Sequence, residues 1–166
     1  MENLDQPKSL KTDTLDFIFN FVKDAPEHQL EDANMLDNKV IQILSVASII
    51  IGLLGFGIRK IALNHVLTII SLIVVILAYI AVVCFAIIHL KAAAFRRSLH
   101  ADELWQEHWD NSVLNIKHDL VSDISEAYSH NKSVLSKKNK TLFGALIALG
   151  IQVVSVGVFI ASFLLG

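Results

Sequence analysis

The chain has 166 residues, with 14 Lys and Arg against 16 Asp and Glu, and a formal net charge of −2. Its charged fraction of 18% is below the roughly 25% of an ordinary soluble domain. The charge balance is not that of a nucleic-acid-binding protein, and the single cysteine, Cys84, excludes an intrachain disulfide. The composition indicates a small membrane protein with no nucleic-acid partner.

Three stretches contain no Asp, Glu, Lys or Arg: Val40–Ile58 (19 residues), Val66–Leu90 (25) and Leu142–Leu165 (24). About 20 apolar residues, rising 1.5 Å each, cross the hydrocarbon of a bilayer. The short connection Arg59–His65 makes the first two stretches an antiparallel hairpin. We therefore expect an all-α membrane protein with three transmembrane helices, a hairpin plus a third helix, and long amphipathic cytoplasmic helical extensions.

The polar segments divide the chain into four parts: an N-terminal helical segment (1–39), the hairpin (40–90), a second polar helical segment (91–141) and the third membrane helix (142–166). In the first part, Thr12 or Asp13 can cap a short helix, because Leu15, Ile18, Phe19 and Val22 recur at helical spacing. Asp24, two residues before Pro26, then predicts a second helix start. We expect one helix over Pro26–Ile58.

The polar segment 91–141 contains neither glycine nor proline. The strong helix formers Ala92–Ala94 predict that the second membrane helix continues past Lys91 to Arg97. Apolar residues at roughly helical spacing further along predict two or more amphipathic helices, the later one merging with the third membrane helix.

Orientation follows from Lys and Arg near the membrane ends. Nine of these residues collect on one face, against Arg59 and Lys60 on the other. They are Lys23, Lys39, Lys91, Arg96, Arg97, Lys132, Lys137, Lys138 and Lys140. This bias predicts that the N-terminus and residues 91–141 are cytoplasmic and that the C-terminus lies on the opposite side. An Asp37 bridge to Lys138 or Lys140 is also possible, and at a wet interface it would contribute little.

Small and polar residues mark the first and third membrane helices. On the first helix, Asn38 and Gln42 lead into a stripe of small residues. The candidates for helix packing or pore lining are Ser45, Ser48, Gly52, Gly55, Gly144, Gln152, Ser155 and Gly157. Small residues let helices approach closely in lipid. The stripes either pack within the chain, with Gln152 hydrogen-bonded to a neighbouring helix, or meet in an oligomer. A pore would need several copies.

Residues 100–110 combine carboxylates, histidines and two tryptophans. His100, Glu103, Glu107 and Asp110 share a helix face, but a metal site needs a second such set, so we expect a solvated face and no metal. Trp105 and Trp109 have three interpretations: a lipid-interface belt, packing on the N-terminal helix, or stacking on a base-containing ligand.

Recognisable catalytic machinery is absent from the sequence, which lacks a Gly-rich phosphate loop, a nucleophile elbow and a CxxC motif. Apart from His89, at one end, the membrane stretches contain no ionisable residue of the kind that marks transporters. We expect neither an enzyme nor a bound cofactor.

The order of parts resembles the small membrane effectors of bacterial nucleotide-signalled antiphage systems, the Pycsar transmembrane effectors and the SLATT-type hairpin proteins. The matching motifs are Asp37-Asn-Lys39 before the first membrane helix and Asn131 followed by Lys137 and Lys138 before the last. The resemblance covers about residues 30–165. It implies cytoplasmic detection of a cyclic nucleotide, homo-oligomerisation and damage to the prokaryotic inner membrane in antiviral defence.

No nucleotide pocket can be assigned from the sequence. Arg96 and Arg97, the only adjacent arginines, together with Trp105 and Trp109, are the candidates for sensing a ligand. The function expected first is an oligomeric membrane effector whose cytoplasmic helices sense a signal and whose membrane helices rearrange. The alternative is a non-catalytic membrane interaction protein, such as a scaffold or an accessory subunit.

Overall fold

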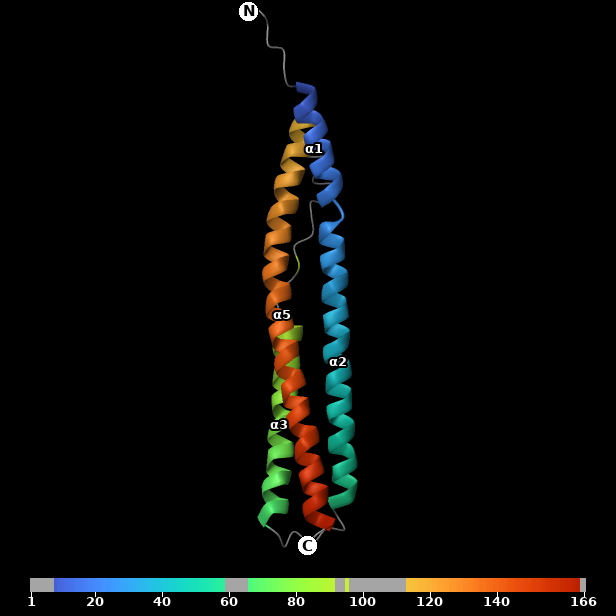
Figure 1. Ribbon diagram of the computed structural model, residues 1–166, viewed down its shortest axis with the longest axis vertical. Helices are drawn as coiled ribbons and strands as arrows, with labels where there is room; N and C mark the ends of the chain where they lie inside the picture. Colours follow the sequence, from blue (N-terminus) through green and yellow to red (C-terminus); the bar gives the residue numbers. More distant parts are fainter. Residues whose placement is uncertain (1–7, 59–65, 92–94, 96–112, 165–166) are drawn as a thin grey trace, which may run out of the picture. The chain divides into compact units, whose positions relative to one another are not determined.

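The computed structural model describes residues 8–58, 66–91, 95 and 113–164. Four helices account for nearly all of this part, and no strand occurs in it: α1 (Lys8–Val22), α2 (Ala25–Ile58), α3 (Val66–Leu90) and α5 (Val113–Leu164). Helices α2, α3 and α5 each contain a segment long and apolar enough to cross a membrane (Figure 1). The expected fold class, an all-α protein with three membrane-type helices, is therefore confirmed.

The two N-terminal helices meet at a short turn over Lys23 and Asp24. Helix α1 starts at Lys8, earlier than the expected cap at Thr12 or Asp13. Helix α2 starts at Ala25, and the backbone N–H of His28 donates to the carbonyl of Asp24 at 3.2 Å. This is the first hydrogen bond of the helix, as expected for an N-cap residue, so the predicted start beside Asp24 is confirmed to within one residue.

Helix α3 ends at Leu90. The next residue, Lys91, forms a turn, and its backbone N–H donates to the carbonyl of Ile87 at 3.0 Å. The expected continuation to Arg97 is wrong, because Phe95 is described and is not helical. Helix propensity contributes only tenths of a kcal/mol per residue, so packing decides where a helix ends.

Helix α5 is a single helix of 52 residues that includes the whole third apolar stretch as far as Leu164. The predicted merging of an amphipathic helix with the third membrane helix is confirmed. Any further helix expected in the polar segment before Val113 falls largely outside the described residues.

The chain forms two compact units, and each combines segments distant in sequence. The polar unit contains residues 1–33 and 93–135, and the membrane unit contains residues 34–92 and 136–166. In the polar unit, Lys117 on α5 donates to Asp16 on α1 at 2.6 Å, and the Gln29 amide on α2 donates to the carbonyl of Tyr128 at 3.2 Å. The start of α5 therefore packs on the N-terminal helices of its own chain.

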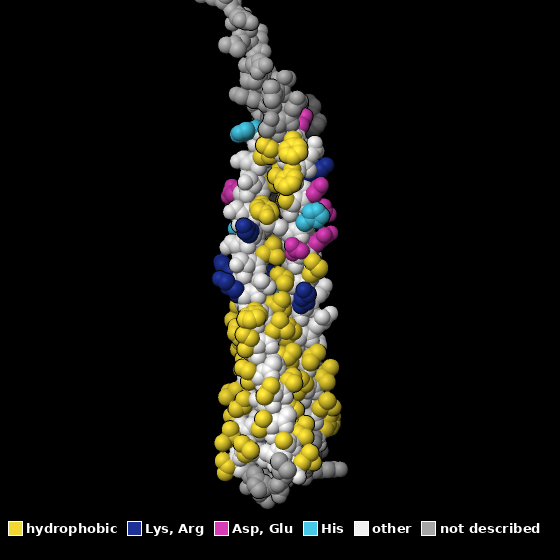
Figure 2. All heavy atoms as spheres, in the orientation of Figure 1, with side chains coloured by type: hydrophobic (Ala, Val, Ile, Leu, Met, Phe, Trp, Pro, Cys, Tyr) yellow, Lys and Arg dark blue, Asp and Glu magenta, His cyan; other side chains and the backbone are white. Residues whose placement is uncertain are grey.

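The membrane unit is a three-helix bundle with a core of small and branched apolar side chains. Its buried members are Val40, Ile43, Ala47, Val82, Ala86, Leu142, Ala145 and Ala148. Alanines at this interface let the backbones approach closely, which is how helices associate in lipid. The outer face is also apolar, and Figure 2 shows hydrophobic side chains covering the lower part of the molecule. Lipid can solvate such a surface, whereas a soluble monomer rarely exposes one this large.

Two contacts between each pair of helices give the direction of the helices in the membrane unit. Helix α5 contacts α2 through Lys138 to Asp37 and through Gln152 to Ala47. Helix α3 contacts α5 through His89 to Thr141 and through Thr68 to Ser162. Helices α2 and α5 therefore run parallel, and α3 runs antiparallel to both. One end of the bundle consequently brings together the residues near position 37 of α2, position 89 of α3 and position 138 of α5.

Candidate functional site: a polar network joining the three membrane helices

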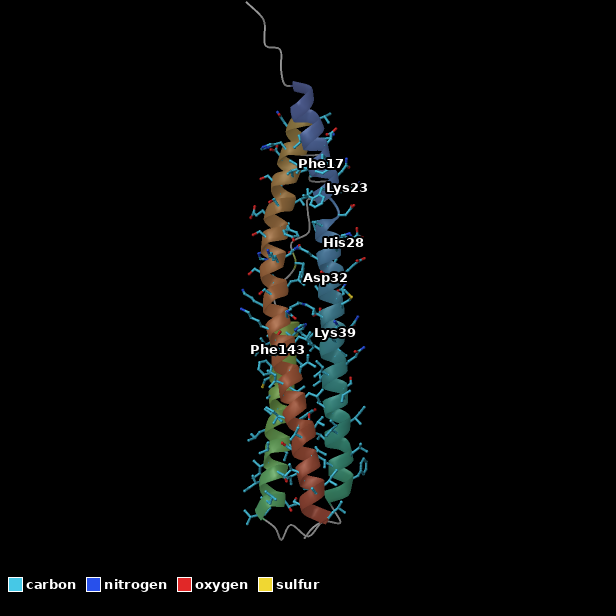
Figure 3. All side chains as sticks on the ribbon, viewed as in Figure 1. Phe17, Lys23, His28, Asp32, Lys39 and Phe143 are labelled. Atoms are coloured by element: carbon cyan, nitrogen blue, oxygen red, sulfur yellow. The ribbon has the colours of Figure 1, made fainter. Side chains whose placement is uncertain are left out.

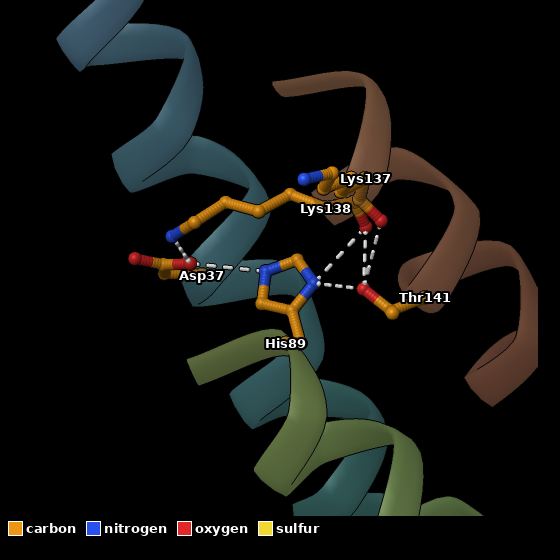
Figure 4. A network of polar contacts seen from close by, with 5 residues as sticks. All are labelled: Asp37, His89, Lys137, Lys138 and Thr141. Atoms are coloured by element: carbon orange, nitrogen blue, oxygen red, sulfur yellow. Dashed lines mark hydrogen bonds and ion pairs between the residues drawn. The ribbon is translucent and has the colours of Figure 1, made fainter. Parts of the chain in front are cut away.

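A buried histidine connects the three membrane helices at this shared end. His89, on the last turn of α3, is 0% exposed. Its Nε2 atom lies 2.9 Å from Oδ1 of Asp37 on α2. Its Nδ1 atom lies 2.9 Å from the hydroxyl of Thr141 and 3.0 Å from the carbonyl oxygen of Lys138, both on α5 (Figure 4). One imidazole ring therefore contacts both neighbouring helices.

The Oδ1 atom of Asp37, which lies against His89, also accepts a hydrogen bond from Lys138. The ammonium group of Lys138 lies 2.6 Å from Oδ1 of Asp37. The Lys138 side chain is 7% exposed and the Asp37 side chain 30% exposed, so the lysine stem is buried while the carboxylate keeps some access to solvent. We call these four residues, Asp37, His89, Lys138 and Thr141, the polar network.

The Thr141 hydroxyl has a choice of partners. It can donate to the carbonyl of Lys138 at 2.8 Å, to the carbonyl of Lys137 at 3.3 Å, or to Nδ1 of His89. Since a hydroxyl carries one proton, it donates to only one of them at a time. In the tautomer with a proton on Nε2, the ring donates to Asp37 and accepts from Thr141, which satisfies both ring nitrogens.

The network differs from the bridge that the sequence suggested. The Asp37–Lys138 pair forms, and the Lys138 side chain is buried, so the premise of a wet interface does not hold for this lysine. Taking charges out of water is costly unless they are paired and hydrogen-bonded. The pair therefore favours one register of α2 against α5 over registers that would separate the buried Lys138 from Asp37.

Sequence reasoning missed the part that His89 plays in this network. A signal was present: Asp37, His89 and Lys138 each lie within about one helical turn of the same polar boundary, marked by Val40, Leu90 and Leu142. In a hairpin plus a parallel third helix these three boundaries meet.

Three of the four small and polar residues predicted on the third membrane helix lie at or near the bundle interior. Gln152 is 0% exposed and donates its amide to the carbonyl of Ala47 at 3.1 Å, while its side-chain oxygen has no hydrogen-bond partner among the described residues. A Cβ atom added at Gly144 would lie 2.7 Å from the ring of Phe85 on α3. Ser155 is half-buried, and Gly157 is exposed.

The predicted residues of α2 face outward. Ser45, Ser48, Gly52 and Gly55, which we call the α2 small face, are all exposed. The two hydroxyls donate to the carbonyls of Ile41 and Leu44 at 2.8 Å, and Ser48 also contacts the Tyr79 hydroxyl at 3.2 Å. A Cβ atom added at Gly52 or Gly55 would meet nothing within 4 Å. Apart from the contact of Ser48 with Tyr79, the described residues of the three-helix unit thus leave this face uncovered.

The ligand-sensing candidates Arg96, Arg97, Trp105 and Trp109 lie outside the described residues, as do the carboxylates and histidines of residues 100–110. Among the residues that are described, no group of three or more His, Cys, Asp or Glu side chains could hold a metal ion. The polar network is the most extensive side-chain constellation of the membrane unit in the described part of the chain.

No known protein family, no curated protein and no solved structure matches the chain.

Proposed function

We propose that the chain is an oligomeric integral membrane effector. Its polar unit, in the cytoplasm, senses a signal, and its membrane helices then rearrange to perturb or permeabilise the membrane. The observation that carries the proposal is that the polar network joins three membrane helices, two of which continue without a break into the polar unit. The network is thus the point at which a signal can act on the bundle.

Continuous helices provide the mechanical connection. Helix α2 passes from the polar unit into the membrane unit between Ala33 and Asn34, and α5 does so between Leu135 and Ser136. Asp37 and Lys138 follow these positions within one helical turn. A rotation or bend imposed on either helix by the polar unit therefore reaches these two side chains directly, because an unbroken helix transmits motion along its length.

The polar network has two states in this proposal: a closed state, in which its contacts hold the three membrane helices together, and an open state, in which the Asp37–Lys138 pair is separated. We call the closed network the latch. Breaking a buried ion pair by removing one partner costs about 3–5 kcal/mol. Converting a two-state equilibrium from 1:99 to 99:1 takes about 5.5 kcal/mol of differential binding. A single ligand can supply a difference of this size, so opening the latch is within reach of one binding event in the polar unit.

The α2 small face supports oligomerisation. Three helices are too few to enclose a solvated pathway, so permeabilisation requires several copies. The exposed Ser45, Ser48, Gly52 and Gly55 offer a side where a second copy's helix can approach closely. Release of the latch would alter how α2 presents this face.

The signal proposed is a cyclic nucleotide, and the membrane is the prokaryotic inner membrane. Both come from the resemblance to Pycsar and SLATT-type effectors carried by Asp37-Asn-Lys39 and by Asn131 with Lys137 and Lys138. A role in antiviral defence would place a nucleotide-producing enzyme in the same genetic neighbourhood.

The test is a leakage assay with the full-length protein in dye-loaded vesicles that contain anionic lipid, challenged with a panel of cyclic purine and pyrimidine mononucleotides. We expect at least one nucleotide to release the dye. An Asp37→Asn variant, whose latch is weakened, should leak without any nucleotide. Intact vesicles under every nucleotide, together with no growth arrest on expression of Asp37→Asn in bacteria, would contradict the proposal.

The alternative is a non-conducting membrane interaction protein. It is favoured by the apolar character of the membrane unit, whose described residues place just one fully buried polar side chain, Gln152, near the middle of an apolar stretch. This alternative predicts a stable partner protein on affinity purification and no leakage under any condition.

A further inference from the structure

We propose that four exposed lysines around the polar network form a binding surface for the headgroups of anionic phospholipids. They are Lys39 on α2, Lys91 directly after α3, and Lys137 and Lys140 on α5, and we call them the lysine collar. This inference does not depend on the effector function, because it concerns only how the membrane unit sits in lipid.

The polar network places the collar at one level of the bundle. Contacts among Asp37, His89 and Lys138 fix the register of the three helices. Each collar lysine lies within two residues of one of these three positions, so all four lie around the same end. Figure 2 shows dark-blue side chains directly above the zone of hydrophobic side chains, and Figure 3 labels Lys39 on α2.

The membrane unit does not neutralise the collar itself. Asp37 is the only acidic residue in its sequence segments 34–92 and 136–166, and Lys138 already occupies its carboxylate. None of the four collar lysines forms an ion pair with another described residue. The unit therefore presents four cationic side chains in one belt with no internal anion to balance them.

The position of the lysine collar relative to the bilayer indicates which anion it binds. The uncharged stretch Val40–Ile58 rises about 28 Å at 1.5 Å per residue, which matches the roughly 30 Å of bilayer hydrocarbon. Lys39 directly precedes this stretch, Lys91 directly follows the apolar α3, and Lys140 lies two residues before Leu142. Lysines at this boundary reach the lipid phosphates, and anionic headgroups attract such clusters.

The experiment uses the full chain purified in mild detergent. Native mass spectrometry counts retained phosphatidylglycerol against phosphatidylcholine as the two lipids are titrated in equal amounts. We expect the wild-type chain to prefer phosphatidylglycerol. Since each lysine near an anionic surface strengthens binding about fivefold, Lys137→Gln/Lys140→Gln should reduce this preference by roughly 25-fold. The four-site glutamine variant should abolish it.

Two matched variants separate the collar from net charge. Lys11→Gln/Lys23→Gln removes the same charge from the polar unit, at α1 and at the turn that follows it, and should leave the preference within about twofold of wild type. Lys137→Arg/Lys140→Arg keeps the charge and should keep the preference. The assignment is overturned if wild type shows no preference, if Lys11→Gln/Lys23→Gln loses as much as the collar variant, or if soluble glycerophosphate displaces the retained lipid.

Discussion

The ammonium group of Lys138 lies 2.6 Å from the carboxylate of Asp37, although the two residues are 101 positions apart in the chain. His89, 52 positions from Asp37, contacts the same carboxylate oxygen at 2.9 Å. These contacts hold the first, second and third membrane helices together at one end. The consequences for stability can be measured with single and paired substitutions.

The Asp37–Lys138 pair can be examined with a double-mutant cycle. Asp37→Asn should lower the free energy of unfolding by about 3 kcal/mol, because it removes the carboxylate that lies 2.6 Å from the buried Lys138 ammonium. Lys138→Met should cost less, since it removes the buried charge and keeps the apolar stem. We expect a coupling energy of about 1–2 kcal/mol, measured by SDS-induced unfolding followed by circular dichroism.

Lys137→Met is the control for that cycle. Lys137 is exposed and its side chain makes no ion pair with a described residue, so its replacement should change stability by no more than about 0.5 kcal/mol. Equal losses for Lys137→Met and Lys138→Met, or a coupling energy near zero, would show that the pair does not hold the helices in register.

Gly144 and Phe85 form the tightest helix–helix contact among the described glycines. Gly144→Ala should destabilise the bundle by about 1–3 kcal/mol, because its methyl group would lie 2.7 Å from the Phe85 ring. Adding Phe85→Leu should recover part of the loss. Gly150→Ala is the matched control, since nothing lies within 4 Å of its added Cβ atom. A larger loss for Gly150→Ala than for Gly144→Ala would disprove this packing.

Gln152→Leu should leave stability unchanged or raise it slightly. The substitution loses one hydrogen bond to the carbonyl of Ala47, and such bonds in membranes are worth about 0.6 kcal/mol on average. It also removes a buried oxygen that accepts no hydrogen bond from the described part of the chain, and an unsatisfied polar group costs about 1–3 kcal/mol. A fall of more than 1 kcal/mol in the unfolding free energy would show that Gln152 has a partner beyond Ala47.

Disulfide crosslinking tests self-association through the α2 small face. In a Cys84→Ser background, Gly52→Cys should give dimers on mild oxidation in membranes, because Gly52 is exposed and the space around it is open. Val46→Cys is also exposed but lies about 120° around the helix, so it should crosslink much less. Equal crosslinking at both positions would indicate random collision in place of a defined interface.

Several elements could be predicted because they depend on local composition. The ends of α2 at Ile58 and of α3 at Val66 and Leu90 coincide with the limits of the uncharged stretches. The start of α2 beside Asp24 follows from a cap and a proline within three residues. Helix α3 stops at Leu90 where propensity favours continuation, since residue preferences alone are too weak to decide where a helix ends.

The sequence by itself determined that three helices are long and apolar enough for a membrane and where their charged ends lie, because hydrophobicity and length are properties of contiguous residues. Only the tertiary structure decided which polar residues meet. Asp37, His89 and Lys138 are joined by the parallel course of α2 and α5 and the antiparallel course of α3. It also decided that Gln152 faces the core while Gly52 faces outward, because the rotation of each helix is set by its neighbours.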